Sequence, residues 1–337
     1  MFVSIGARPD ASAALARLER VLVDVPRRIV ACSGGVDSML LATVAHRAAP
    51  TTTTVAHTVT PAVPGDGTAR VAAAAEREGW DLEIVHSTEF DDERYLSNPT
   101  DRCYFCKSNL YDAVAALGVD GPVVLSGANL DDLGEYRPGL VAAAEREVRH
   151  PFVEASITKA EIRSAARSLG LPEADLPASP CLASRLYTGT RVTASRLRAV
   201  EAGESLVRSA TGIDVVRCRI RETTGAPAGS EAAAVSEAPA VRETAAGDGV
   251  APEAGLDVLV EVGDDDRRFV TVEVLAHVLA TMRRVDPTVV DVRLDDDAYE
   301  PGRAFVGAHG VGMSGPEGAS DAESDEVPGG VGHGGGR

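Results

Sequence analysis

The sequence predicts an α/β protein, in which a parallel-sheet domain is followed by a second, smaller α+β domain. In the first half, short apolar runs alternate with longer helical stretches, the pattern of parallel strands joined by helical crossovers. The second half changes to one long helix followed by strands that flank a further helix. The chain has 337 residues, which is enough for two domains with their own cores.

The first domain is expected at residues 1–178 and should contain four parallel strands. Its strands are expected at residues 28–32, 52–58, 82–86 and 123–126, and its clearest helices at residues 37–47 and 68–78. Parallel strands bring their carboxyl ends to one edge of a sheet, where such sheets bind ligands. The turn Ser33-Gly34-Gly35 and the segment Gly127-Ala128-Asn129 should therefore share one rim.

The second domain is expected at residues 179–306, with a three-stranded sheet. Its helices are expected at residues 193–209 and 269–284, and its strands at residues 213–220, 256–262 and 288–294. A segment rich in Ala, Glu, Gly, Pro and Ser separates the first two strands. A long surface loop at this place costs little free energy, so these two strands can still be neighbours.

Half of the negative charge lies in two segments that we expect to be disordered. The chain has 33 Lys and Arg against 51 Asp and Glu, a formal net charge of −18. Residues 222–255 carry −5 of this charge and residues 307–337 carry −4. Neither segment can bury enough apolar surface to offset the entropy of ordering it. They are predicted to be a disordered insert and a disordered acidic, glycine-rich tail.

The composition argues against several classes of protein. An acidic chain with 4% aromatic residues is a poor nucleic-acid binder, because phosphate contacts need clustered Lys and Arg. No stretch approaches the roughly 20 apolar residues of a membrane span, and Met1 to Pro9 lacks a signal-peptide core. Five cysteines are too few for a disulfide scaffold. We expect a cytoplasmic protein with neither nucleic-acid nor membrane partners.

The hexapeptide Ser33-Gly34-Gly35-Val36-Asp37-Ser38 is the first motif with chemical meaning. Its glycines let the backbone approach an anion, and the amides of the following helix point toward that anion. Ser33 and Ser38 can donate hydroxyl hydrogen bonds, and Asp37 can hold Mg2+ beside phosphates. A glycine pair alone would equally suit an ordinary strand-to-helix turn. The complete hexapeptide after an apolar strand is more specific, and it is no Walker A loop because Gly-Lys-Ser/Thr is missing.

This hexapeptide resembles the SGGxDS fingerprint of the PP-loop ATP pyrophosphatases. The resemblance implies ATP as a substrate, with Ser33, Gly34, Gly35, Asp37, Ser38 and Gly127 at the ATP and pyrophosphate site. It further implies reaction at the α-phosphate. An oxygen of the second substrate is adenylated, pyrophosphate leaves, and a sulfur or nitrogen nucleophile then displaces AMP.

Three cysteines form the second motif. Cys103 and Cys106 are three residues apart at the start of an expected helix, and Cys181 lies in an irregular segment that opens the second domain. A closed zinc site takes four protein ligands, and no second CxxC exists. Three thiolates instead suit an iron–sulfur cluster with one open iron. The alternative is a packing or redox pair, with Cys181 as a small buried residue.

The surroundings of these cysteines resemble the LarE family. The similarity rests on residues 98–107 (NPTDRCYFCK), 126–139 (SGANLDDLGEYRPG), 158–163 (TKAEIR) and 180–185 (PCLASR), and covers roughly residues 28–294 apart from the insert. The family adenylates the carboxylates of pyridinium-3,5-biscarboxylic acid mononucleotide and replaces oxygen by sulfur, for the nickel-pincer nucleotide of lactate racemase. The resemblance implies a homo-oligomer whose pathway partners are an upstream carboxylase/hydrolase and downstream nickel-insertion proteins.

Two sulfur sources occur in this family. Some members sacrifice a cysteine at the position of Cys181, while others hold a [4Fe-4S] cluster on three cysteines and transfer a sulfide bound to its open iron. Cys103 and Cys106 match the additional pair, so the chain resembles the cluster type. The implied ligands are Cys103, Cys106 and Cys181, with Cys181 also counted as catalytic.

The family resemblance suggests further site residues. Lys107 and Arg185 are the other catalytic candidates, and Ser184, Arg185, Arg217, Arg219 and Glu204 are candidates for substrate or phosphate binding. A solvated strand face is the alternative for the arginines, and an exposed helix position for Lys107 and Glu204. Cys32 and Cys218 are expected in the core. In the family, an acidic residue associated with a metal lies in the region that the insert interrupts here. The candidates for this residue are Glu261, Asp264 and Asp265.

Three other functions compete with this interpretation. A tRNA thiolation enzyme shares the chemistry but needs a basic surface, whereas an ammonia-using adenylating synthetase would need no cysteine. An iron–sulfur or nucleotide-sensing module would bind ATP without releasing pyrophosphate.

Overall fold

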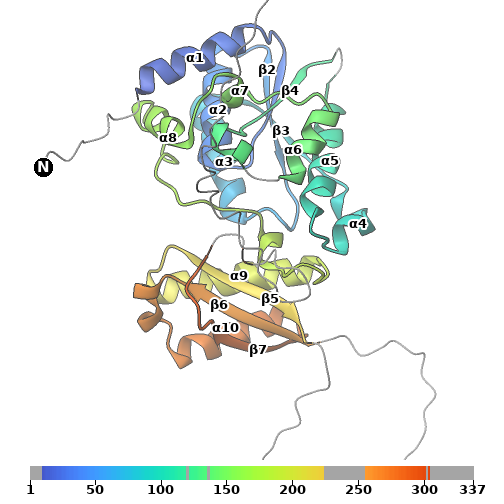
Figure 1. Ribbon diagram of the computed structural model, residues 1–337, viewed down its shortest axis with the longest axis vertical. Coiled ribbons are helices and arrows are strands. Elements are labelled where there is room, and N and C mark those ends of the chain that lie inside the picture. The colour runs from blue at the N-terminus through green and yellow to red at the C-terminus, as the bar shows by residue number, and fades with distance from the viewer. Residues whose placement is uncertain (1–9, 119–120, 135–136, 224–254, 301–302, 304–337) are drawn as a thin grey trace, which may run out of the picture.

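The structure is a computed structural model that describes residues 10–118, 121–134, 137–223, 255–300 and 303 (Figure 1). The predicted tail at residues 307–337 lies outside the described residues, as does nearly all of the predicted insert. The insert starts later than predicted. Glu222 is the last residue of a strand, where it pairs with Leu256 and its carboxylate accepts a 2.7 Å hydrogen bond from Arg196.

The first sheet is parallel throughout, with strand order β3-β2-β1-β4. Its strands are β1 (Arg28–Ala31), β2 (Thr53–Thr58), β3 (Asp81–Val85) and β4 (Val123–Ser126). Helices cover both faces: α1 (Ala11–Val23), α2 (Val36–Ala48), α3 (Gly65–Glu78), α4 (Glu93–Leu96), α5 (Arg102–Ala115), α6 (Pro138–Glu145), α7 (Pro151–Glu154) and α8 (Lys159–Ser168). The predicted α/β fold class is confirmed.

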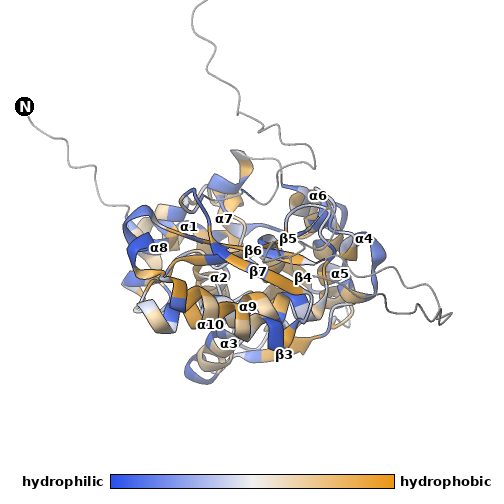
Figure 2. Cartoon of the chain, turned by 90° about the horizontal axis from the view of Figure 1, so that it is seen from below, coloured by the Kyte–Doolittle hydropathy of each residue, from blue (hydrophilic) through white to orange (hydrophobic). Residues whose placement is uncertain are grey.

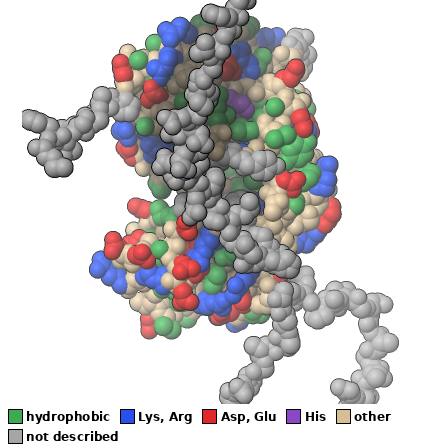
Figure 3. All heavy atoms as spheres, viewed as in Figure 1, with side chains coloured by type: hydrophobic (Ala, Val, Ile, Leu, Met, Phe, Trp, Pro, Cys, Tyr) green, Lys and Arg blue, Asp and Glu red, His purple; other side chains and the backbone are tan. Residues whose placement is uncertain are grey.

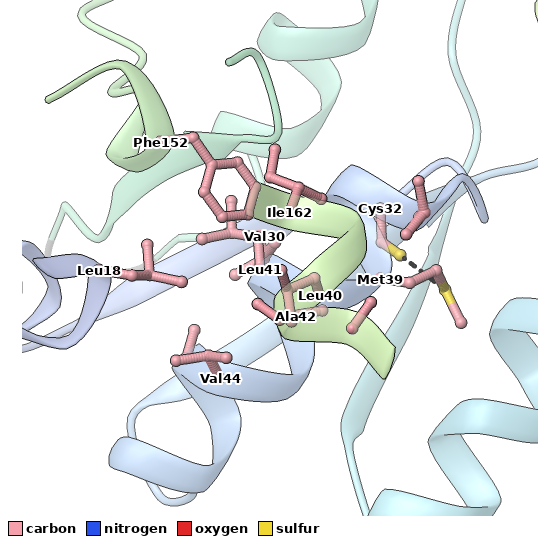
Figure 4. Packing of buried hydrophobic residues seen from close by; sticks show 14 of the residues in the cluster. Leu18, Val30, Cys32, Met39, Leu40, Leu41, Ala42, Val44, Phe152 and Ile162 are labelled. Atoms are coloured by element: carbon pink, nitrogen blue, oxygen red, sulfur yellow. Dashed lines mark hydrogen bonds between the residues drawn. The ribbon is translucent and has the colours of Figure 1, made fainter. Parts of the chain in front are cut away.

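Alternating residues of the central strand supply the two cores of this sheet. Val30 packs with Leu41 and Phe152 in the cluster that α1, α2 and α8 cover (Figure 4). Ile29, its neighbour in sequence, packs on the opposite side with Tyr111 of α5. Both faces of β1 are therefore covered, and its Ile29-Val30-Ala31 run is apolar, as the sequence pattern indicated. The edge strand β3 is instead mostly exposed.

The second sheet has the order β5-β6-β7 and combines one antiparallel with one parallel pairing. Its strands are β5 (Val216–Glu222), β6 (Leu256–Val262) and β7 (Val289–Leu294), and its helices are α9 (Ala194–Thr211) and α10 (Val272–Val285). Figure 2 shows the two helices side by side beneath this sheet. The strands that flank the insert are neighbours, as predicted.

Backbone contacts join the two halves of the chain. The Leu182 N–H donates to the Ala62 carbonyl at 2.8 Å, and the Val192 N–H donates to the Leu96 carbonyl at 2.8 Å. Tyr95 belongs to the same apolar cluster as the strands of the second sheet. The carboxyl edge of the first sheet therefore faces the start of the second unit, which is where the predicted site residues converge.

Among the described residues, no helix is long and apolar enough to cross a membrane. On the face drawn in Figure 3, basic and acidic side chains are interspersed over both units. This face lacks the uniform positive field that favours binding to a nucleic-acid backbone.

Candidate functional site

The phosphate turn is Ser33-Gly34-Gly35 together with the start of α2. Gly35 is the N-cap residue of α2 and supplies no capping side chain, so the first amides of the helix have no side-chain partner there. The Ser38 hydroxyl accepts from the Ser33 N–H at 3.1 Å and donates to the Gly35 carbonyl at 3.1 Å. These bonds fold the turn around a backbone concavity of the kind that binds anions.

Two glycines allow the close approaches that build this rim. Gly34 has φ +82°, and a Cβ placed there would lie 2.5 Å from the Gly67 carbonyl oxygen. A Cβ on Gly127 would lie 2.9 Å from the Ser38 nitrogen. The structure thus brings the ends of β1 and β4 together with the first turns of α2 and α3.

We expect Gly34→Ala to abolish nucleotide binding and to lower the thermal midpoint more than Gly79→Ala does. Gly79 also has positive φ, +71°, but a Cβ there meets nothing within 4 Å. Gly79→Ala therefore measures the left-handed backbone cost alone, about 1 kcal/mol, whereas Gly34→Ala adds a backbone clash. Thermal unfolding and equilibrium binding of ATP check the difference. Equal destabilisation by the two variants would contradict the proposed close packing.

Asp37 and Lys159 form an ion pair beside the phosphate turn. Lys159 is the first residue of α8, and its Nζ bonds to Asp37 Oδ2. Asp37 Oδ1 is buried and has no hydrogen-bond partner among the described residues. Magnesium at phosphate sites is commonly held by one or two carboxylates plus phosphate oxygens, so this oxygen fits such an ion. Lys159 belongs to the motif at residues 158–163, whose local pattern predicts no role for it.

The three cysteines lie where the two units meet. Cys103 and Cys106 are on the first turn and a half of α5, and Cys181 directly precedes a 3-10 turn at Leu182–Arg185. All three thiols are free and partly exposed. Burial raises the pKa of Cys103, and the neighbouring Cys181 raises it further. The sequence-distant Cys181 is therefore an electrostatic neighbour of the CxxC pair.

The donor chemistry of the three thiols is the one that iron–sulfur clusters use. No three His, Cys, Asp or Glu side chains of the described chain are placed to hold one metal ion. A [4Fe-4S] cluster takes Cys thiolates as its usual donors. Cys103, Cys106 and Cys181 supply such donors, and the buried cation Arg102 interacts electrostatically with all three.

Glu89 and Tyr95 also lie beside the thiols, and neither was predicted from the sequence. Cys106 Sγ donates to Glu89 Oε2 at 3.4 Å, and Thr60 Oγ1 donates to Glu89 Oε1 at 2.8 Å. The Tyr95 hydroxyl is buried without a hydrogen-bond partner among the described residues. Burial, then Glu89 and Cys181, raises the pKa of Tyr95. Neither residue belongs to a motif, so only the fold identifies them.

Lys107 lies beside the thiols on α5. Its Nζ is 5.8 Å from the centroid of the Tyr111 ring. Burial lowers its pKa, but Tyr111 and the three cysteines together raise it, so that the net direction is upward. A cation at this place could neutralise negative charge that develops near the sulfur atoms.

Arg185 and Glu204 form a buried bidentate ion pair. Arg185 Nε donates to Glu204 Oε1 at 2.8 Å and Nη2 donates to Oε2 at 3.0 Å, with both residues at most 2% exposed. Arg185 Nη1 donates to the carbonyls of Pro180 and Cys181 and to the Ser184 hydroxyl. The pair thus fixes the backbone around Cys181. Its predicted contact with substrate phosphate stays a prediction.

Arg217 and Arg219 point from β5 toward the Cys181 segment. Arg219 donates to Glu261 Oε2 at 2.8 Å and to the Ser184 carbonyl at 2.9 Å. Arg217 donates to the Ala178 carbonyl at 3.1 Å and stacks on the Tyr299 ring at 5.2 Å. It has no carboxylate partner among the described residues, so its charge is not neutralised there.

The structure also places the two remaining cysteines and the three candidate metal-associated acids. Cys218 faces the opposite side of β5 and is fully buried, and Cys32 is 3% exposed in the first core, so both are core residues as expected. Of the candidate acids, Glu261 is buried against Arg219. Asp264 and Asp265 are exposed on a 3-10 turn after β6, and in the described part of the chain they contact neither the three cysteines nor Arg217 and Arg219.

Comparisons with known proteins give related chains over much of this region. An uncharacterized protein of Synechocystis sp. is 38% identical over 207 residues, which are 61% of this chain and 77% of the relative. The pyridinium-3,5-bisthiocarboxylic acid mononucleotide synthase of Lactiplantibacillus plantarum is 30% identical over 207 residues, 60% of this chain and 75% of that enzyme. An uncharacterized protein of Methanocaldococcus jannaschii is 27% identical over 183 residues, 54% of this chain and 69% of the relative.

No protein-family model matches the chain. The assignment therefore rests on identity and coverage, with three quarters of the Lactiplantibacillus enzyme aligned. The chain belongs to the LarE family, the family of pyridinium-3,5-bisthiocarboxylic acid mononucleotide synthase.

Proposed function

We propose that this protein is an ATP-dependent sulfur transferase of nickel-pincer nucleotide synthesis. Its substrate would be pyridinium-3,5-biscarboxylic acid mononucleotide, and its products the thiocarboxylate, AMP and pyrophosphate. The observation that carries the proposal is a shared location. The phosphate turn packs on the first turn of α3, whose Gly65 N–H donates to Glu201 of α9, and the three free thiols lie beside the core of the second unit, in a chain related to the bisthiocarboxylic acid mononucleotide synthase.

The phosphate turn would orient ATP for attack at its α-phosphate. A substrate carboxylate oxygen forms the new P–O bond while the bond to the leaving pyrophosphate breaks. The α2 amides would stabilise the negative charge that leaves, and the hydroxyls of Ser33 and Ser38 would do so by turning toward it from their partners within the turn. Asp37 would hold Mg2+ through its unpartnered oxygen, after nucleotide binding or through a shift of Lys159.

The residues around the three cysteines would carry out the transfer of sulfur to the adenylated substrate. A sulfur nucleophile held near Cys181 forms the C–S bond, and AMP leaves with the carboxylate oxygen. Lys107 lies next to the thiols and would stabilise the anionic charge of that step. Cys103, Cys106 and Cys181 would hold a [4Fe-4S] cluster, which supplies sulfide when bound. Arg217, whose charge is unneutralised, would bind the phosphate of the substrate.

Nucleotide products test the adenylation step. ATP, Mg2+ and the biscarboxylic mononucleotide should yield AMP and pyrophosphate in equal amounts, measured by ion-exchange chromatography. Formation of ADP and phosphate would refute chemistry at the α-phosphate. ATP binding without turnover would favour the sensing module, and turnover that depends on ammonia rather than on the cysteines would favour a synthetase.

A further inference from the structure

An arginine on α3 lies against the phosphate turn. Arg70 is half-buried, and its Nε donates to the Gly34 carbonyl at 3.0 Å. A Cβ on Gly67 would lie 3.2 Å from the Ser33 carbonyl oxygen and 3.8 Å from Arg70 Nη2. The first turn of α3 therefore packs directly on the turn, and this packing places the guanidinium beside it.

The rest of the Arg70 guanidinium is unused. Neither Nη1 nor Nη2 makes a hydrogen bond or an ion pair with any described residue. Arg77, two turns later on the same helix, instead pairs with Glu78 at 3.4 Å and with Glu173 at 3.9 Å. Arg70 thus keeps donors and a charge available at a place where the backbone is shaped for an anion.

The charges around the turn also leave Arg70 available to bind an anion. Lys159 is neutralised by Asp37, and the hydroxyls of Ser33 and Ser38 carry no charge. The Gly34 carbonyl is moreover a partial negative charge within the turn, and Arg70 offsets it. Among the described residues bonded to this turn, Arg70 supplies the positive charge that no carboxylate cancels.

We propose that Arg70 is a phosphate-binding residue that holds the pyrophosphate end of ATP through its two Nη atoms, while Nε stays on Gly34. The inference rests on the proposed ATP site and adds to it a cation from α3. Two parallel N–H···O bonds from guanidinium suit phosphate oxygens. The expected consequence is selective: Arg70 contributes to binding of pyrophosphate and ATP but not to binding of AMP.

Calorimetric titration with three probes tests this role. For Arg70→Gln we expect the Kd of magnesium pyrophosphate and of ATP to rise about tenfold or more, because a charged hydrogen bond to phosphate is lost. The Kd of AMP should stay within about twofold. Arg77→Gln is the matched control on the same helix, and it should leave all three values unchanged.

A second variant separates phosphate binding from simple support of the turn. The glutamine amide can still donate to the Gly34 carbonyl, whereas Arg70→Lys keeps the charge. If Arg70 binds phosphate, the Lys variant recovers pyrophosphate affinity and the Gln variant does not. If Arg70 only supports the turn, Gln binds pyrophosphate at least as well as Lys, and the proposal is overturned.

The titrations also distinguish this inference from the proposed function. If the unaltered protein binds neither ATP nor pyrophosphate, the proposed ATP site itself fails. If it binds both and Arg70→Gln binds them equally well, only the role of Arg70 fails. A rise in the Kd of AMP equal to that of pyrophosphate would likewise overturn the proposed placement at the pyrophosphate end.

Discussion

Replacing Cys181 with alanine should lower thiocarboxylate formation by roughly 100-fold or more, because the sulfur nucleophile or its ligand is removed. Pyrophosphate release should continue, since the substitution leaves every residue of the phosphate turn unaltered. Liquid chromatography with mass spectrometry measures the thiocarboxylate, and a coupled assay measures pyrophosphate. Retained sulfur transfer would contradict the role of Cys181.

Two sets of variants sharpen this test. Cys218→Ala removes a cysteine from the core of the second unit and should keep sulfur transfer, which controls for the loss of any thiol. Cys103→Ser and Cys106→Ser separate the sulfur sources. If a cluster carries the sulfur, both variants lose multiple turnover. If Cys181 is sacrificed, both variants still complete one turnover, and Cys181 loses one sulfur atom.

Replacing Glu204 with alanine should destabilise the protein by about 3–5 kcal/mol, because it leaves the Arg185 guanidinium buried without its carboxylate. Glu204 is 1% exposed and also accepts from the Cys218 N–H at 3.1 Å, so water cannot readily take its place. Urea unfolding followed by circular dichroism measures the change in the free energy of unfolding.

Arg208 provides the matched control for this effect. Its Nη1 lies 3.6 Å from Glu204 Oε2, but its side chain is 34% exposed. Arg208→Ala should therefore cost less than about 1 kcal/mol. A loss of similar size in both variants would show that the buried geometry of Arg185 and Glu204 is not what stabilises this region.

The sequence predicted those parts of the fold that depend on local pattern. The strand β4 was placed without error, and β1, β2 and β3 were placed within one residue at either end, because short runs rich in apolar and β-branched residues between helical stretches mark strands. The strand at Val216–Glu222 was predicted to start three residues early and to end two residues early. Gly212 ends α9 in the left-handed conformation, and the residues after it form a connection before pairing starts.

The site could be predicted only as far as its motifs extend. The phosphate turn and the cysteines were identified because spacing and local conformation define them. The partners that decide their chemistry come from distant segments. Lys159 is 122 residues from Asp37 in the sequence, and Glu89 contacts Cys106 from the 3-10 turn that follows β3. Such contacts depend on the packing of the whole chain, which no local pattern encodes.

The arginines also show what a sequence pattern leaves open, namely which charges are paired with carboxylates in the fold. The sequence indicated positive charge gathered around a polyanionic nucleotide, but it could not show which charges are already paired. In the structure Glu204 and Glu261 neutralise Arg185 and Arg219, whereas Arg217 lies on Tyr299. Of these three arginines, Arg217 therefore presents the strongest attraction for a phosphate.

The most direct test of the central claim is mass spectrometry of the nucleotide product after anaerobic reconstitution with iron and sulfide. The protein is incubated with ATP, Mg2+ and pyridinium-3,5-biscarboxylic acid mononucleotide. We predict a product in which sulfur replaces a carboxylate oxygen, formed only with ATP and together with AMP. An unchanged mononucleotide in the presence of AMP and pyrophosphate formation, or thiolation of tRNA instead, would contradict it.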